Sequence, residues 1–244
     1  DGRSDAAVVA RDLGLRADGS AFTLVCPRLG LDRRVELRLA ARFNVENAVA
    51  AAAAGLALGL PHEAVFHGLA VTEGVPGRFQ AVRAGQPFSV VVDYSHTPDS
   101  LENALKAARA VTDGRVLAVF GCGGDRDRGK RPLMGAIGAR LADRSVITSD
   151  NPRSEDPAAI AAEVRAGALA ARSEDREHPA VVEEVPDRAE AIRMAVQEAG
   201  PHDVVVIAGK GHEQGQEFRD RVEPFDDAEV VRSVISPAEG AADR

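Results

Sequence analysis

The sequence predicts an α/β fold whose larger, C-terminal part is a Rossmann-like, doubly wound and mostly parallel sheet. Beyond residue 77, near-continuous apolar runs alternate with amphipathic stretches of helical period, which is typical of parallel strands covered by helices on both faces. Residues 6–40 differ, because apolar and polar positions alternate there as in half-buried antiparallel strands. The two patterns are separated by Glu73-Gly74-Val75-Pro76-Gly77, which is typical of a linker between domains.

The first part, residues 1–76, is expected to hold few elements. Ala and Leu dominate the longer of its two helices, which we expect Asn44 to cap and Gly59-Leu60-Pro61 to end. So few elements make a thin core for an independent domain, and we interpret this part as the trailing half of a domain. The expected elements are strands at 21–26 and 34–39 and helices at 44–59 and 61–69.

The second part, residues 77–238, carries the alternation of strands and helices. Thr97 is suited to cap a helix, and Pro98 fits the first helical position. We expect residues 239–244 to form a disordered tail. The expected strands lie at 88–93, 115–120, 144–149, 179–183 and 203–208, and the expected helices at 98–111, 131–142, 157–172, 187–199 and 227–235.

Composition excludes several classes of protein. A net charge of −8 over 244 residues argues against a nucleic-acid groove, which needs a basic face. No apolar run approaches the roughly 20 residues of a membrane helix, and the N-terminus shows no signal peptide. Cys26 and Cys122 are too few for a metal cluster or a disulfide framework, so we expect reduced thiols in a cytoplasmic protein. The start at Asp1 instead of Met suggests a processed or partial chain.

Two loops carry the strongest functional signal. Asp150-Asn151-Pro152-Arg153 and Gly209-Lys210-Gly211-His212-Glu213 each follow an apolar run that is typical of a buried strand. Because ligands of an open α/β sheet bind beyond the carboxyl ends of its strands, we expect both loops to face one pocket. The guanidinium of Arg153 suits a carboxylate, and the carboxylate of Glu213 suits an ammonium. An amino acid, which carries both charges, would satisfy both loops.

The segment from Gly121 to Pro132 lies between an expected strand and an expected helix. Its Gly124-to-Lys130 spacing matches part of a phosphate-binding P-loop, but Arg131 stands where Ser or Thr must hold magnesium. We therefore interpret the segment as a glycine-rich turn with solvated charges. Arg126 nevertheless remains a candidate carboxylate ligand.

Further candidates lie in two other strand-end segments. Asp93, Tyr94 and His96 exceed what the turn before Thr97 requires, and they suit either ring stacking or ribose binding, with a plain turn as the alternative. Lys210 and His212 stand between glycines after a strand and are the candidate catalytic residues, although glycine turns are common at such places. No residue spacing indicates a metal site, and the remaining histidines suit the surface.

Six motifs, in this order, are similar to the second half of the Mur ligases of peptidoglycan synthesis, above all to the members that add meso-diaminopimelate. The resemblance covers essentially the whole chain. The motifs are Arg42-Phe43-Asn44-Val45-Glu46-Asn47-Ala48, Gly74-Val75-Pro76-Gly77-Arg78-Phe79, Asp93-Tyr94-Ser95-His96-Thr97-Pro98-Asp99, Gly121-Cys122-Gly123-Gly124-Asp125-Arg126-Asp127, Asp150-Asn151-Pro152-Arg153 and Gly209-Lys210-Gly211-His212-Glu213.

The resemblance implies an ATP-dependent ligase that forms an amide through an acyl phosphate. Residues 1–76 would be the trailing half of a P-loop-type central ATPase domain, and residues 77–238 the C-terminal amino-acid-binding domain. The implied cofactors are ATP and Mg²⁺, with the magnesium ligands in the half that precedes this sequence in the family. The resemblance assigns Asn47 and His96 to the adenine end of ATP and Arg78 and Asp93 to its phosphates or ribose. The full set of implied cofactor-binding residues is Asn44, Asn47, Arg78, Asp93, Tyr94 and His96.

The resemblance also implies the substrates, UDP-N-acetylmuramoyl-L-alanyl-D-glutamate and meso-diaminopimelate. In the family, Asp-Asn-Pro-Arg is the signature for diaminopimelate. Lysine lacks the carboxylate that Arg153 would bind, so lysine would leave Arg153 unpaired at a cost of roughly 1–3 kcal/mol. The implied substrate-binding residues are Arg126, Asp150, Asn151, Pro152, Arg153, Gly209 and Glu213.

The 244 residues contain neither the P-loop nor the modified lysine of the family, so we expect this polypeptide alone not to catalyse the ligation. Full turnover by the purified chain would overturn that expectation. Two alternatives stay open. One is a non-catalytic module that binds an amino acid or a nucleotide. The other is a ligase like folylpolyglutamate synthetase. Such a ligase should not need the combination of Arg153 and Glu213.

Overall fold

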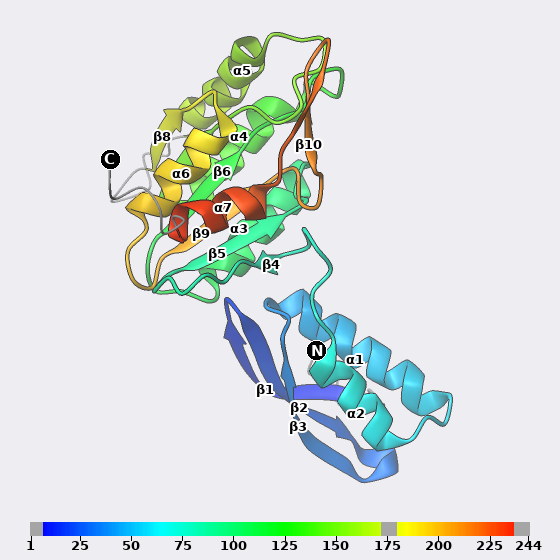
Figure 1. Cartoon of the computed structure of the whole chain (residues 1–244). Helices are drawn as coiled ribbons and strands as arrows, with labels where there is room; N and C mark the ends of the chain where they lie inside the picture. Colours follow the sequence, from blue (N-terminus) through cyan, green and yellow to red (C-terminus); the bar gives the residue numbers. More distant parts are fainter. Residues whose placement is uncertain (1–6, 172–179, 237–244) are drawn as a thin grey trace, which may run out of the picture. The chain divides into compact units, whose positions relative to one another are not determined.

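A computed structural model describes residues 7–171 and 180–236 (Figure 1). The chain divides into two compact units, Asp1–Val75 and Pro76–Arg244. The division falls inside the segment 73–77, where the glycines and the proline predicted a linker. The tail expected at 239–244 lies outside the described residues.

The first unit pairs a small antiparallel sheet with two helices. The strand order is β1-β2-β3. The strand β1 was not predicted as a separate strand, and its pairing with β2 shifts register between Arg11 and Gly14. The elements are β1 (Val9–Arg16), β2 (Gly19–Cys26), η1 (Pro27–Leu29), β3 (Leu31–Leu37), α1 (Arg42–Ala57) and α2 (His62–Val71).

Apolar side chains of β2 and β3 pack against the two helices to form the core of this unit. The strands contribute alternate residues, and α1 contributes residues three and four apart, as one face of a helix requires. Outside this core Leu58 is 81% exposed and Val75 65% exposed, so the unit leaves large apolar side chains uncovered. The buried core consists of Phe22, Leu24, Val35, Leu37, Val45, Ala48, Ala52 and Phe66.

The predicted N-cap of α1 was wrong. The helix begins at Arg42, with Ala41 as its N-cap, because the chain turns at Ala41 with a φ of 73°. Asn44 therefore lies inside the first turn, where its side-chain Nδ2 donates a hydrogen bond to the Ala40 carbonyl at 2.7 Å.

The second unit contains the predicted doubly wound sheet, which is thereby confirmed. Its order is β4-β5-β9-β6-β7-β8, and every neighbouring pair is parallel except β4 with β5. The short antiparallel edge strand β4 was not predicted. The strands are β4 (Gln80–Ala81), β5 (Ser89–Asp93), β6 (Val116–Phe120), β7 (Arg144–Ile147), β8 (Val181–Glu184) and β9 (Val204–Ala208).

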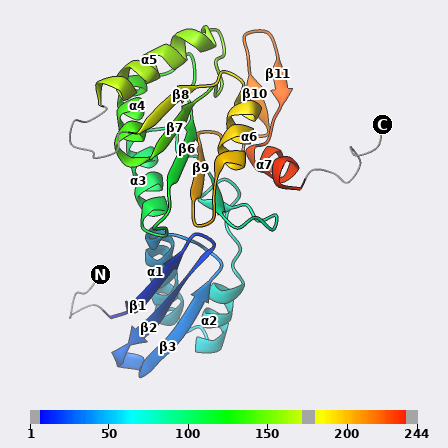
Figure 2. The ribbon, with the colours of Figure 1, turned by 90° about the vertical axis from the view of Figure 1, so that its left-hand side faces the viewer.

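Helices cover both faces of this sheet. Three of them pack side by side on one face, and α6 and α7 pack together on the other (Figure 2). This explains the apolar runs, because β6 and β9 are buried on both faces. The helices are α3 (Pro98–Arg109), α4 (Lys130–Leu141), α5 (Pro157–Ala170), α6 (Arg188–Glu198) and α7 (Asp227–Ile235).

Most of these helices begin at N-cap side chains, close to the positions expected from the sequence. Thr97 and Ser100 form a capping box at the start of α3, with Pro98 in the first turn, as predicted. Aspartate side chains accept from backbone N–H groups at the starts of α5, α6 and α7. A short hairpin of β10 (Gly215–Glu217) and β11 (Val222–Pro224) was not predicted, because its residues are mostly polar. No helix in the described ranges is long and apolar enough to cross a membrane.

A buried ion pair joins α6 to α7. Arg188 donates through Nε and Nη2 to the two carboxylate oxygens of Asp227, both at 2.8 Å, and both side chains are fully buried. Nη2 also lies 3.2 Å from the carbonyl of Ala208, at the end of β9. Burial opposes the charge on Arg188, but the Asp227 carboxylate outweighs it and keeps the guanidinium pKa above its ordinary value. The pair thus supports the strand whose following loop carries Gly209 to Glu213.

We predict that Asp227→Ala lowers the free energy of unfolding by about 3–5 kcal/mol, because it leaves a buried guanidinium without its counter-ion. Urea unfolding followed by circular dichroism measures the change. Asp220→Ala is the control, since its carboxylate is 75% exposed and pairs only at the surface, so its effect should stay within about 0.5 kcal/mol. Equal stability of the two variants would contradict the role given to Arg188.

Candidate functional site

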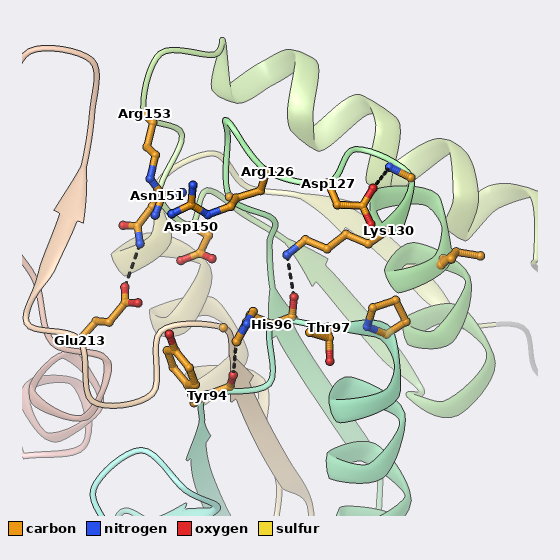
Figure 3. A pocket seen from close by; sticks show the side chains of 15 residues that line it. Tyr94, His96, Thr97, Arg126, Asp127, Lys130, Asp150, Asn151, Arg153 and Glu213 are labelled. Atoms are coloured by element: carbon orange, nitrogen blue, oxygen red, sulfur yellow. Dashed lines mark hydrogen bonds between the residues drawn. The ribbon is translucent and has the colours of Figure 1, made fainter.

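A cavity of about 650 Å³ lies at the carboxyl ends of β5, β6, β7 and β9 (Figure 3). The loops after these strands meet there because parallel strands all end at the same edge of the sheet. Its lining residues are Tyr94, His96, Thr97, Pro98, Gly123, Arg126, Asp127, Gly129, Lys130, Leu133, Asp150, Asn151, Arg153, Gly209 and Glu213.

The two loops with the strongest sequence signal meet at one end of this cavity. Asn151 donates through Nδ2 to Glu213 Oε2 at 2.8 Å, which joins the loop after β7 to the loop after β9 (Figure 3). Within the described residues, the second carboxylate oxygen of Glu213 accepts no hydrogen bond. Glu213 therefore keeps one acceptor available for a ligand.

Lys210 contacts the side chains of both loops but does not line the cavity. Its side chain is fully buried, and Nζ donates to Asn151 Oδ1 at 2.8 Å and to Glu213 Oε2 at 3.2 Å. Asp150 Oδ1 lies 3.7 Å from the same nitrogen and has no hydrogen-bond partner among the described residues. A buried ammonium requires such acceptors, so Lys210 holds the polar side chains in place. This geometry fits a positioning residue better than the catalytic residue suggested by the sequence.

Arg153 has partners that the sequence did not reveal. Its Nε lies 2.7 Å from Glu217 Oε2, and its Nη1 donates to the Gly124 carbonyl at 3.0 Å. Lysine would therefore not leave Arg153 unpaired, and the predicted penalty has to be corrected.

The β10–β11 hairpin holds the loop that carries Arg153. The backbone of Arg153 has a φ of 52°, which a non-glycine residue adopts only when its surroundings enforce it. Its N–H donates to the Glu217 carbonyl at 3.0 Å. Gln216 Nε2 donates to the Asp150 carbonyl at 2.8 Å, and Glu217 N–H donates to Asn151 Oδ1 at 3.0 Å. Sequence reasoning missed these residues because their polar pattern does not indicate a strand.

The glycines after β6 serve close packing between loops. A Cβ on Gly124 would lie 1.9 Å from the Pro152 carbonyl oxygen, so no other residue fits there. Pro152 contributes this backbone contact and does not line the cavity. Arg126 does line it, and within the part of the chain that the structure describes its guanidinium donates only to the neighbouring Asp125 carbonyl, at 3.1 Å. Arg126 thus keeps donors available for a carboxylate.

Arg131, which interrupted the P-loop pattern, has a structural role. Its side chain is fully buried and pairs with Glu155 at 2.8 Å and Glu163 at 3.1 Å. The Arg131 guanidinium lowers the pKa of Glu155 to about 2. Hydrogen bonds from Ser154 likewise lower the pKa of Asp125. These contacts tie the loop after β6 to the residues that directly follow Arg153.

Aromatic side chains gather at the end of β5. The rings of Tyr94 and His96 meet edge to face with centroids 4.6 Å apart, and the ring of His212 lies 5.5 Å from Tyr94. The guanidinium of Arg78 lies 4.9 Å from the centre of the Tyr94 ring. Asp93 is occupied by the fold, because it accepts from Phe79 N–H at 2.6 Å and from the Ser95 hydroxyl.

The structure therefore brings together most, but not all, of the residues predicted for a site. Asn44 and Asn47 belong to the first unit, whose placement relative to the cavity is not determined. The cavity is also lined by three residues that were not predicted, Asp127, Lys130 and Leu133. Lys130 was missed because the P-loop pattern to which it belongs was rejected. The predicted residues that line the cavity are Tyr94, His96, Arg126, Asp150, Asn151, Arg153, Gly209 and Glu213, and those of the second unit that do not are Arg78, Asp93, Pro152, Lys210 and His212. Within the described ranges, no group of three or more His, Cys, Asp or Glu residues could hold a metal ion.

Comparison with known protein families and curated sequences gives consistent relatives. The family described as "Mur ligase, glutamate ligase domain" matches residues 77–211. A Streptomyces avermitilis protein named UDP-N-acetylmuramoyl-L-alanyl-D-glutamate–2,6-diaminopimelate ligase is 48% identical, over 98% of this chain and 47% of that protein. The Bacillus velezensis protein of the same name is 44% identical, over 95% of this chain and 45% of that protein. The chain thus spans about half the length of the curated relatives it matches.

Solved structures agree with the sequence comparison. A structure of a ligase with the same name matches with a TM-score of 0.73 at 40% identity, over 97% of this chain and 46% of that chain. Folylpolyglutamate synthase from Thermotoga maritima matches with a TM-score of 0.64 at 19% identity, over 84% of this chain and 44% of that chain. At 19% identity, the second likeness shows a shared fold alone.

We predict that the Arg131–Glu155 pair makes stability fall in acid. Because the folded pKa of Glu155 is about 2, below its ordinary 4.5, its contribution is complete above pH 4.5 and is lost as the pH falls towards 2. Glu155→Gln should therefore flatten the dependence of Tm on pH in this window. Glu102→Gln, which removes an exposed carboxylate paired with Lys106, is the control. If the Tm of Glu155→Gln fell with pH as steeply as that of the wild-type chain, Glu155 would not be the source of the acid sensitivity.

Proposed function

The chain belongs to the Mur ligase family, and we propose that it is the amino-acid-binding portion of a ligase that adds meso-diaminopimelate to UDP-N-acetylmuramoyl-L-alanyl-D-glutamate. Relatives at 44% and 48% identity carry the name of that ligase, which supports this choice of substrates. The observation that carries the proposal is the charged end of the cavity. There Arg126 and Arg153 offer guanidinium donors, and Asp150 and Glu213 offer carboxylate acceptors.

This arrangement matches the distal end of diaminopimelate, which carries a carboxylate and an ammonium on one carbon. Arg153 and Arg126 would bind the carboxylate, and the free oxygen of Glu213 would accept from the ammonium, with the Asp150 carboxylate adding negative charge beside it. Asn151 is held by Lys210, Glu213 and the Glu217 N–H, so it supports the neighbouring side chains. Because these groups are held in place before a ligand arrives, little ordering accompanies binding.

ATP would supply the phosphoryl group that activates the carboxylate of the other substrate as an acyl phosphate. In the second unit Tyr94, His96 and Arg78 fit a nucleotide, because they combine flat ring faces with a cation. Asp93 fits poorly, since both of its oxygens already accept hydrogen bonds within the fold. We assign no magnesium ligand to the described residues. The role of the cavity is to hold the amino acid so that its reacting amine is correctly oriented.

We predict that the chain binds meso-diaminopimelate more tightly than L-lysine, and that Arg153→Ala removes this preference. The variant should weaken diaminopimelate binding by about 10- to 100-fold, the effect expected for a lost charge-assisted hydrogen bond, and leave L-lysine nearly unchanged. Isothermal titration calorimetry measures both affinities. Arg193→Ala is the control, because it removes a guanidinium that pairs with exposed Glu190 on α6, outside the cavity. Equal wild-type affinity for the two amino acids would refute the proposed specificity.

A further inference from the structure

Lys130 is a cation of the cavity that has no carboxylate partner among residues 7–171 and 180–236. It opens α4, and its Nζ donates to the carbonyl oxygen of His96 at 2.8 Å (Figure 3). That acceptor is a neutral backbone group. Among the described residues, no carboxylate oxygen lies within 4.0 Å of Nζ. An ammonium has three N–H donors, so Lys130 keeps two of them and its whole charge available.

Arg126 shares this property, since it also lines the cavity and, in the described ranges, donates only to a backbone carbonyl, but three other basic side chains in or beside the cavity contrast with Lys130. Lys210 is paired with Glu213, Arg153 with Glu217, and Arg131 with Glu155 and Glu163. Those three are needed to hold the loops together, whereas the contact between Lys130 and His96 O leaves the charge unbalanced. A half-buried cation on a cavity wall without a partner is stabilised when an anion binds beside it.

The position of Lys130 indicates which anion this is. In Figure 3, Arg153, Asn151 and Glu213 gather at one end of the cavity, and the ammonium of Lys130 lies away from them, beside His96. Diaminopimelate carries a carboxylate at each end, and the proposed function uses Arg153 and Arg126 for only one of them. The second carboxylate, next to the amine that reacts, still requires a cation.

We infer that Lys130 binds the carboxylate beside the reacting amine of the acceptor amino acid. This inference rests on the proposed function and adds a second anchor to it. With Arg153 at the distal carboxylate and Lys130 at the near one, the carbon chain is fixed at both ends, and the reacting amine is held in one orientation. L-Lysine retains the near carboxylate, so Lys130 should contribute affinity for both amino acids but no discrimination between them.

The test uses three ligands, because L-lysine and D-lysine are meso-diaminopimelate with one or the other carboxylate removed. In calorimetry with the 244-residue chain, Lys130→Met should lower the affinities for meso-diaminopimelate and for L-lysine by the same factor, about 10- to 100-fold. D-Lysine lacks the near carboxylate, so its affinity should change by less than about threefold. Lys130→Arg, which keeps the charge, should restore most of the affinity for diaminopimelate.

Lys106→Met is the matched control, because it removes the same charge from an exposed site on α3 outside the cavity. Circular dichroism and the urea midpoint verify that each variant is folded. If Lys130→Met is folded and binds diaminopimelate as tightly as Lys106→Met does, the inference is wrong while the proposed function stands. If the wild-type chain does not prefer diaminopimelate to L-lysine, the proposed function itself fails. A loss confined to diaminopimelate would also contradict the inference, because it would place Lys130 at the distal carboxylate.

Discussion

The site depends on one buried charge, the ammonium of Lys210. A fully buried ammonium is tolerated only when acceptors surround it, and here they come from two different loops. Asn151 and Asp150 follow β7, and Glu213 follows β9. Satisfying Lys210 therefore brings the polar groups of both loops to one point. The Arg188–Asp227 pair also stabilises the end of β9, because Arg188 donates a hydrogen bond to the carbonyl of Ala208, the last residue of that strand.

A second constraint is the backbone of Arg153, which has an unfavourable φ of 52°. The β10–β11 hairpin maintains it through hydrogen bonds to the backbone and side chains of the Asp150–Arg153 loop. Glu217 also pairs with the guanidinium and so limits its rotation. Selection of the acceptor amino acid, as proposed, would thus depend on a segment that never lines the cavity.

Residues of the same motifs divide into two groups with different functions. Asp93, Arg131, Pro152 and Lys210 use their polar groups within the fold and stabilise the loops. Arg126, Lys130 and Glu213 line the cavity and keep polar groups available. Only the second group suits direct contact with a ligand, because a group that is already satisfied gains little from a new partner.

The sequence by itself determined the parallel sheet, its flanking helices and the loops that form the candidate site. Apolar periodicity and capping residues such as Thr97 are local signals, and parallel strands must end at one edge. The N-cap of α1, the strands β1, β4, β10 and β11, and the partners of Arg153 and Lys130 were decided only by the tertiary structure. The physical reason is that pairing depends on which atoms meet in space, and the partners of Arg153 lie 29 and 64 residues away along the chain.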